Sequence, residues 1–215
     1  LMGRLFSLFA GDEVEQVAFW VNMLSVFSAA FTVLFLFWSI THLAKKMLIK
    51  ADETLNEAQT IAVMGAGLVG GLVCTFSDSI WFSAVEAEVY AMSSFFTAFV
   101  FWAILRWENI NDESDHNKWL ILIAYMMGLS IGVHLLNLVT IPALGLIVYF
   151  KYVKKITLKG ISMTLLTSGG IIIVILIGVI PGIPSTVGAM EVFFVNSMGF
   201  PFGSGAVVSV SYTHL

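Results

Sequence analysis

Residues 119–150 read WLILIAYMMGLSIGVHLLNLVTIPALGLIVYF, a run of 32 residues that contains no Asp, Glu, Lys or Arg. One straight helix of this length would extend for about 48 Å, whereas the hydrocarbon core of a bilayer is about 30 Å thick. Two membrane-spanning helices would each be short. Length alone therefore leaves both arrangements open.

The charged residues on either side of this run decide between the two arrangements. Arg106 and Lys118 precede it, and Lys151, Lys154, Lys155 and Lys159 follow it. Lysine and arginine accumulate in the cytoplasmic loops of membrane proteins. Both flanks must then lie on the same side, which requires an even number of crossings, so we split the run near His134 to Asn137.

Further uncharged stretches are long enough to cross a bilayer, at Val17–Thr41, Ala58–Ser77, Val89–Leu105 and Ile161–Ile180. With the two halves of residues 119–150 they make six spans. The chain is 59% hydrophobic and only 11% charged, with a mean hydropathy of +0.95, whereas a soluble domain carries about 25% charged residues. The sequence predicts an all-α polytopic transmembrane helical bundle, with one membrane domain over residues 1–208.

This topology separates the charges by sign. Nine of the ten basic residues fall on the cytoplasmic face, which are Lys45, Lys46, Lys50, Arg106, Lys118, Lys151, Lys154, Lys155 and Lys159, while Arg4 does not. The extracytoplasmic face receives Asp12, Glu13, Glu15, Asp78, Glu86, Glu88, His134, Asn137, Pro181, Pro184 and Glu191. A net charge of −4 without a basic surface indicates no nucleic-acid partner, and the bilayer is the expected surrounding.

Residues 65–70 read GAGLVG, which matches the G-x-G-x-x-G dinucleotide fingerprint. That fingerprint requires a strand, a turn and a helix, but here the glycines lie inside one apolar run. Close helix packing is the better interpretation for Gly67 and Gly71, and also for the pairs Gly128/Gly132 and Gly178/Gly182. The single Cys74 excludes a disulfide within the chain.

Three carboxylates, Asp78, Glu86 and Glu88, lie between two predicted spans among aromatic residues. Asp78 could cap a helix and the two glutamates could simply be solvated beside an interfacial aromatic belt. Alternatively, Glu86 and Tyr90 are i,i+4 neighbours that could present a carboxylate and a phenol together. No cofactor is firmly predicted; the three acids could bind a divalent cation, but their spacing defines no ligand set.

His134 and Asn137 are spaced i,i+3 at the break of the long run, which predicts that they share one helical face. They could form a hydrogen bond between helices or line a watered cavity, since polar groups at membrane depth are costly. Residues 107–118 are predicted to form a solvated cytoplasmic turn. His42, Lys45 and Lys46 are expected to contact headgroups or a helix dipole.

Six motifs follow one another in a characteristic order. They are GRLFSLF at 3–9, VNMLS at 21–25, FWSITH at 37–42, TFSD at 75–78, WFSAVEAEVY at 81–90 and GLSIGVHLLN at 128–137. In these motifs the sequence resembles, over residues 1–200, a bacterial family related to the transmembrane protein O-mannosyltransferases of the GT-C type glycosyltransferase superfamily.

The resemblance implies a membrane enzyme that takes a sugar, such as mannose, from a polyprenyl-phosphate carrier and transfers it to a protein or glycan acceptor outside the cytoplasm. It implies the bacterial inner membrane as the location and a site that faces the periplasm. Inverting displacement requires a carboxylate base for the acceptor hydroxyl and groups that stabilise the departing phosphate.

Such families carry the principal acid in a Trp-Asp-x-Gly-Glu-Phe-like loop followed by His-Pro-Pro-Gly, and this sequence contains neither motif. The acid is expected upstream of Leu1, so this chain alone is expected to be inactive. The matched positions, Asp78, Glu86, Glu88, Tyr90, His134 and Asn137, are candidates for lining the donor and acceptor cavity.

Within that set, the expected roles are hydroxyl binding for Glu86, Glu88 and Asn137, and phosphate contact for His134. Residues 209–215 resemble a non-native tail and carry no functional expectation. The alternative functions are a transporter or flippase for a lipid-linked or polar substrate, and a membrane scaffold without catalysis.

Overall fold

A computed structural model describes residues 2–49, 54–110, 113–205 and 207. Every regular element among these residues is a helix and none is a strand, which confirms the all-α prediction. The chain forms two compact units, residues 1–156 and residues 157–215, and each is described by itself.

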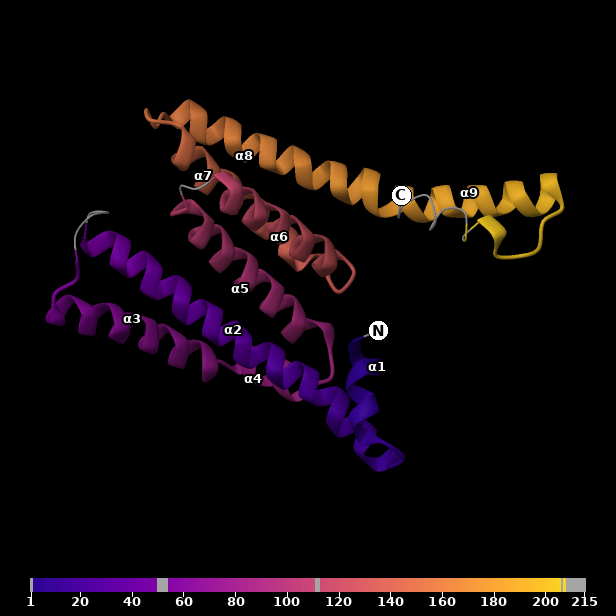
Figure 1. Ribbon diagram of the computed structural model, residues 1–215, viewed down its shortest axis with the longest axis horizontal. Helices are drawn as coiled ribbons and strands as arrows, with labels where there is room; N and C mark the ends of the chain where they lie inside the picture. The colour runs from indigo at the N-terminus through magenta and orange to yellow at the C-terminus, as the bar shows by residue number, and fades with distance from the viewer. Residues whose placement is uncertain (1, 50–53, 111–112, 206, 208–215) are drawn as a thin grey trace. The chain divides into compact units, whose positions relative to one another are not determined.

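The first unit contains seven α-helices among its described residues. These are α1 (Met2–Ser7), α2 (Val17–Leu48), α3 (Glu57–Thr75), α4 (Asp78–Val85), α5 (Val89–Glu108), α6 (Glu113–Ile131) and α7 (Ile141–Tyr152). Short 3-10 turns occupy Leu8–Ala10, Val14–Gln16 and Leu135–Thr140, the last labelled η3. The long helix α2 packs against α3 and α5, and α6 lies antiparallel beside α5 (Figure 1).

Helix α5 carries most of the core. Val100, Ala103, Ile104 and Trp107 recur on one of its faces and are buried, together with Ile123 of α6. This i, i+3, i+4, i+7 spacing is the stripe by which a helix buries one side. The core therefore lies where α5 meets α6 and α7.

The predicted break in residues 119–150 is confirmed. Helix α6 ends at Ile131, His134 adopts an extended conformation with φ −162° and ψ 149°, and η3 then leads into α7. Pro142 stands in the first turn of α7, where its missing N–H costs no hydrogen bond.

Five helical segments of the described residues are long and apolar enough to cross a membrane: Val14–Leu48, Glu57–Thr75, Val89–Glu108, Leu135–Tyr152 and Leu158–Met198. The sequence predicted six. Helix α6 falls short because its start carries Asp115, His116 and Lys118, which leaves 13 apolar-rich residues from Trp119 to Ile131.

The glycine prediction is confirmed at Gly67. At Gly67 an added Cβ would lie 2.5 Å from Thr41 Cγ2 and 2.9 Å from the Phe37 ring, so α2 and α3 approach closely there. At Gly128 an added Cβ would meet no atom within 4 Å, so no close helix contact is found there. Gly178 and Gly182 lie in the second unit, and their packing stays a prediction. The nucleotide fingerprint is also excluded, since residues 65–70 lie inside the continuous helix α3.

The second unit is built on one long helical segment. α8 (Leu158–Ile173), the π-helical η4 (Val174–Val179) and α9 (Ile180–Met198) follow without a break, and Gly199 ends α9 with φ 71°. The expected span ended at Ile180, but the helix continues past Pro181. A π-helical stretch directly before a proline accommodates its missing donor and its ring, which explains the continuation.

The predicted single membrane domain over residues 1–208 stays a prediction. The proposed non-native tail, residues 209–215, lies outside the described residues.

Candidate functional site

The first unit has two chemically different ends. The polar end is formed by the first turns of α2 and α5, by α4, by the last turn of α6 and by η3 (Figure 1). The basic end is formed by the last turns of α2, α5 and α7 and by the first turns of α3 and α6. All six candidate residues belong to the polar end.

The three carboxylates lie at the two ends of α4, with Asp78 at its start and Glu86 and Glu88 in the turn between α4 and α5, and all three are exposed. Ser77, not Asp78, is the N-cap of α4, so Asp78 stands in the first turn, where its charge favours the helix dipole. Glu86 has an extended conformation with φ −104° and ψ 135° and precedes α5. The predicted i,i+4 helical pair of Glu86 and Tyr90 is therefore wrong.

Glu88 is the N-cap of α5, and its side chain makes no capping hydrogen bond. It lines a cleft of about 410 Å³ that α1, α2, α5 and α6 enclose. Val21 and Ser25 of α2, Met92 of α5 and Gly132 after α6 form other parts of the wall. A carboxylate thus stands beside a mainly apolar hollow of a size typical of small-molecule sites.

Tyr90 and His134 come together from the start of α5 and from the break after α6. Their ring centroids are 5.5 Å apart and the ring planes are inclined by 55°. The His134 Nδ1 accepts a hydrogen bond of 3.1 Å from the Leu136 backbone N–H. Because Nδ1 accepts this bond, Nε2 is the ring nitrogen that is left to donate to a ligand.

Asn137 is buried, with 2% of its surface exposed. Thr140 Oγ1 lies 2.6 Å from the Asn137 backbone oxygen and 3.2 Å from its Oδ1, whereas Nδ2 has no hydrogen-bond partner. The predicted helical pair is replaced by a 3-10 turn, of which His134 is the N-cap and Asn137 the third residue.

Buried polar atoms without partners gather at the polar end, a feature that the sequence did not reveal. Among the described residues of the first unit these atoms are Trp20 Nε1, Asn22 Oδ1, Ser93 Oγ, Trp107 Nε1, Ser130 Oγ and Asn137 Nδ2. All except Trp107 Nε1 lie within the first two turns of α2 or α5, the last turn of α6, or η3. Buried polar groups are normally paired, so this concentration indicates a place for water or a polar ligand.

No group of three or more His, Cys, Asp or Glu side chains that could hold a metal ion is present in the part of the chain that the structure describes. Asp78, Glu86 and Glu88 are therefore not gathered into such a group.

The family described as protein O-mannosyl-transferase TMEM260 N-terminal domain has a sequence model that matches residues 1–157. The chain belongs to this family. The match spans the first unit, including the cleft and all six candidate residues. No curated protein and no solved structure matches the chain.

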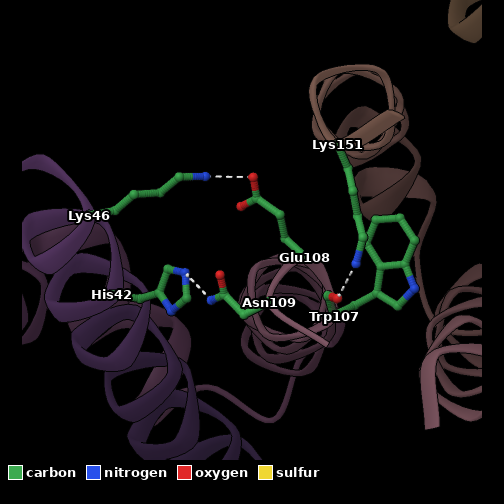
Figure 2. A network of polar contacts seen from close by, with 6 residues as sticks. All are labelled: His42, Lys46, Trp107, Glu108, Asn109 and Lys151. Atoms are coloured by element: carbon green, nitrogen blue, oxygen red, sulfur yellow. Dashed lines mark hydrogen bonds and ion pairs between the residues drawn. The ribbon is translucent and has the colours of Figure 1, made fainter. Parts of the chain in front are cut away.

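At the basic end of this O-mannosyl-transferase domain, polar side chains join three helices (Figure 2). Lys46 Nζ lies 2.5 Å from Glu108 Oε1, and Asn109 Nδ2 lies 3.1 Å from His42 Nε2, which connects α2 to α5. Lys151 of α7 donates to the backbone oxygens of Trp107 at 3.0 Å and Ile110 at 2.9 Å.

Trp107 is part of the core of this O-mannosyl-transferase domain, with 1% of its surface exposed, so the prediction of a solvated turn is wrong at this residue. Lys151 Nζ lies 4.4 Å from its ring centroid, and the His116 ring lies 4.5 Å from it. The tryptophan is thus covered by residues that follow it in the chain by 9 and 44 positions.

Proposed function

We propose that the protein is a membrane glycosyltransferase of the GT-C type that transfers a sugar, such as mannose, from a polyprenyl-phosphate carrier to a protein hydroxyl outside the cytoplasm. Membership of the O-mannosyl-transferase family supports the transfer chemistry. The five apolar helical segments support a multi-pass membrane enzyme, for which we propose the bacterial inner membrane.

One observation indicates where in the molecule the transfer site would lie. The cleft beside Glu88 and the unpartnered buried polar atoms share the end of the bundle that is opposite to the basic residues. Since basic residues favour the cytoplasmic side, the polar end then faces the periplasm. A lipid-borne sugar at the outer leaflet would meet the protein there.

The reaction is a displacement at the anomeric carbon. The acceptor oxygen forms the new bond to this carbon, the bond between the carbon and the phosphate oxygen breaks, and the phosphate leaves on its lipid. The acceptor proton passes to a carboxylate base, which we assign to the loop motif that this sequence does not contain. The residues of this chain bind and orient the reactants.

The proposed roles follow from the chemistry of each group. The Glu88 carboxylate accepts hydrogen bonds from hydroxyl groups of the sugar or acceptor, and Glu86 is the second carboxylate at the same turn. His134 Nε2–H donates to the phosphate oxygen, where negative charge grows as the carrier departs. The unpartnered Nδ2 of Asn137 is a donor for a hydroxyl or for a bound water.

The test is transfer of labelled mannose from polyprenyl-phosphate mannose to a peptide rich in serine and threonine by the full-length enzyme. Loss of a charged hydrogen bond costs about 1.5–3 kcal/mol, so Glu88→Ala and His134→Ala should each reduce transfer by about 10- to 100-fold. Glu57→Ala removes an exposed carboxylate from the start of α3 and serves as the control. Parental activity in Glu88→Ala would remove Glu88 from the site.

A further inference from the structure

A second cavity lies at the basic end, opposite to the cleft. It has a volume of about 440 Å³ and lies between α2, α5 and α7. Leu43, Phe101, Leu105, Ala143, Leu146 and Ile147 form most of its walls, and Lys46 and Glu108 also line it. The groove is therefore apolar along its length and has a charged pair at one place.

The charged pair stands at the mouth of the groove. Lys46 and Glu108 lie in the last turns of α2 and α5, while Phe101 and Ala143 lie two turns deeper. Seven residues of helix separate Glu108 from Phe101, which corresponds to roughly 10 Å of apolar wall. A groove of this shape can hold an extended hydrocarbon chain whose polar group lies at the mouth.

The charge around the mouth is positive. Lys45, Lys46 and Arg106 all act electrostatically on the His42 side chain, together with Glu108. Glu108 also acts on Lys151. Lys46 pairs with Glu108, and Lys45 and Arg106 lie near His42, so basic side chains outnumber the one carboxylate at this place. The side chain of Lys46 is 54% exposed although it pairs with Glu108.

We infer that this groove binds an anionic phospholipid, with an acyl chain between α2, α5 and α7 and the phosphate at Lys46. An excess of cations at a bilayer boundary needs an anionic counterpart, and a basic pocket between membrane helices is a favourable place for such a headgroup. Free phosphate would satisfy the charge but leave the apolar groove unfilled, whereas a zwitterionic lipid would fill the groove without balancing the charge.

The site is separate from the proposed transfer chemistry. It lies at the other end of the same helices, and its residues have no part in the cleft beside Glu88. Lipid binding can therefore fail while transfer activity is confirmed, or the reverse.

The experiment is native mass spectrometry of the full-length protein in detergent, titrated with phosphatidylglycerol and with phosphatidylcholine of identical acyl chains. The wild type should bind phosphatidylglycerol more tightly. Lys46→Ala should weaken this binding by about fivefold, the effect of one cation near the headgroup. Lys154→Ala removes an equal charge from the same end but from outside the groove, and its affinity should match the wild type.

A second pair of variants tests the acyl chain and leaves the Lys46–Glu108 pair in place. Ala143→Phe fills the groove and should reduce binding of phosphatidylglycerol at least as strongly, whereas Ala124→Phe adds the same ring to an exposed position of α6 and should not. Thermal unfolding without added lipid checks that each variant is folded.

Three outcomes of the lipid titrations would overturn the inference. They are equal wild-type affinity for the two lipids, equal affinity in Lys46→Ala and Lys154→Ala, and full binding of phosphatidylglycerol by folded Ala143→Phe. Inorganic phosphate that competes with the lipid at low millimolar concentration would assign the mouth to a free anion and would also overturn it.

Discussion

The side chain of Asn137 combines two properties that rarely occur together at one residue. It is almost fully buried, and its Nδ2 donates to nothing. An unpaired buried donor costs about 1–3 kcal/mol relative to a paired one. Such a cost is tolerated where function needs the group, and Ser93 and Ser130 show the same property at the same end of the bundle.

Asn137→Leu tests this interpretation at the level of one residue. The leucine removes the unpaired amide and keeps a similar volume, so thermal unfolding in detergent should occur at the same or a higher temperature. Transfer activity should fall by about tenfold, the usual loss for one hydrogen bond. Thr140→Val, which removes the hydroxyl that contacts Asn137, is the control for local packing. A variant with reduced stability and full activity would show that Asn137 is structural.

Lys151 contributes to stability in a different way, because its Nζ has polar partners in the folded protein. It donates to two backbone oxygens of the segment that ends α5 and lies over the Trp107 ring. Lys151→Met keeps most of the aliphatic chain and should destabilise the protein by about 2 kcal/mol, through two carbonyl oxygens left without their charged donor. Lys154→Met should change the unfolding temperature little, and an equal loss in both variants would refute the role of Lys151.

At the scale of helices and turns, α2 and α3 of the first unit approach each other closely at a glycine. Gly67 is buried on α3 against Phe37 and Thr41 of α2, while Gly65 on the same helix has open space around it. The same substitution at these two glycines therefore introduces a methyl group into a packed position in one case and into open space in the other.

Gly67→Ala should destabilise the protein by about 1–3 kcal/mol, because the new methyl group forces α2 and α3 apart. Gly65→Ala should be neutral or stabilising by up to about 1 kcal/mol, since alanine is the better helix former. Thermal unfolding of both variants in the same detergent measures the difference. Equal effects at the two positions would mean that the α2–α3 contact does not form.

Some features of the helices and turns could be predicted from the sequence and others could not. The break after α6 was predictable because it follows from the length of an uncharged run and the charges on its flanks, both of which are local. The helical pairs Glu86/Tyr90 and His134/Asn137 were not, because their spacing predicts a shared face only if one helix contains both residues. In each case the chain leaves the α-helix at the residue concerned.

Burial was harder to predict than helix formation. Trp107 is covered by His116 and Lys151, and the partner 44 residues away gives no local signal. Ser93 and Ser130 look like ordinary residues of apolar helices, and only packing shows that their hydroxyls are buried without partners. The continuation of α9 past Pro181 depends on the π-helical turn before it, which no residue pattern indicated.

At the scale of the whole molecule, the proposed function depends on which end of the first unit faces outward. Transfer from a lipid carrier requires the cleft beside Glu88 at the outer boundary, and the phospholipid groove then lies in the cytoplasmic leaflet. A transporter or flippase would instead expose the cleft residues to both sides in turn. Orientation therefore separates the proposed enzyme from its main alternative.

Cysteine labelling in intact cells measures this orientation directly. The background is the full-length protein in which Cys74, the single cysteine of this sequence, and any other cysteine are replaced by alanine. In that background Glu88→Cys and His134→Cys should both react with a membrane-impermeant maleimide added from outside, and Lys154→Cys should react only after the membrane is opened. Labelling of Glu88→Cys and His134→Cys from opposite sides, or of Lys154→Cys from outside, would contradict the account.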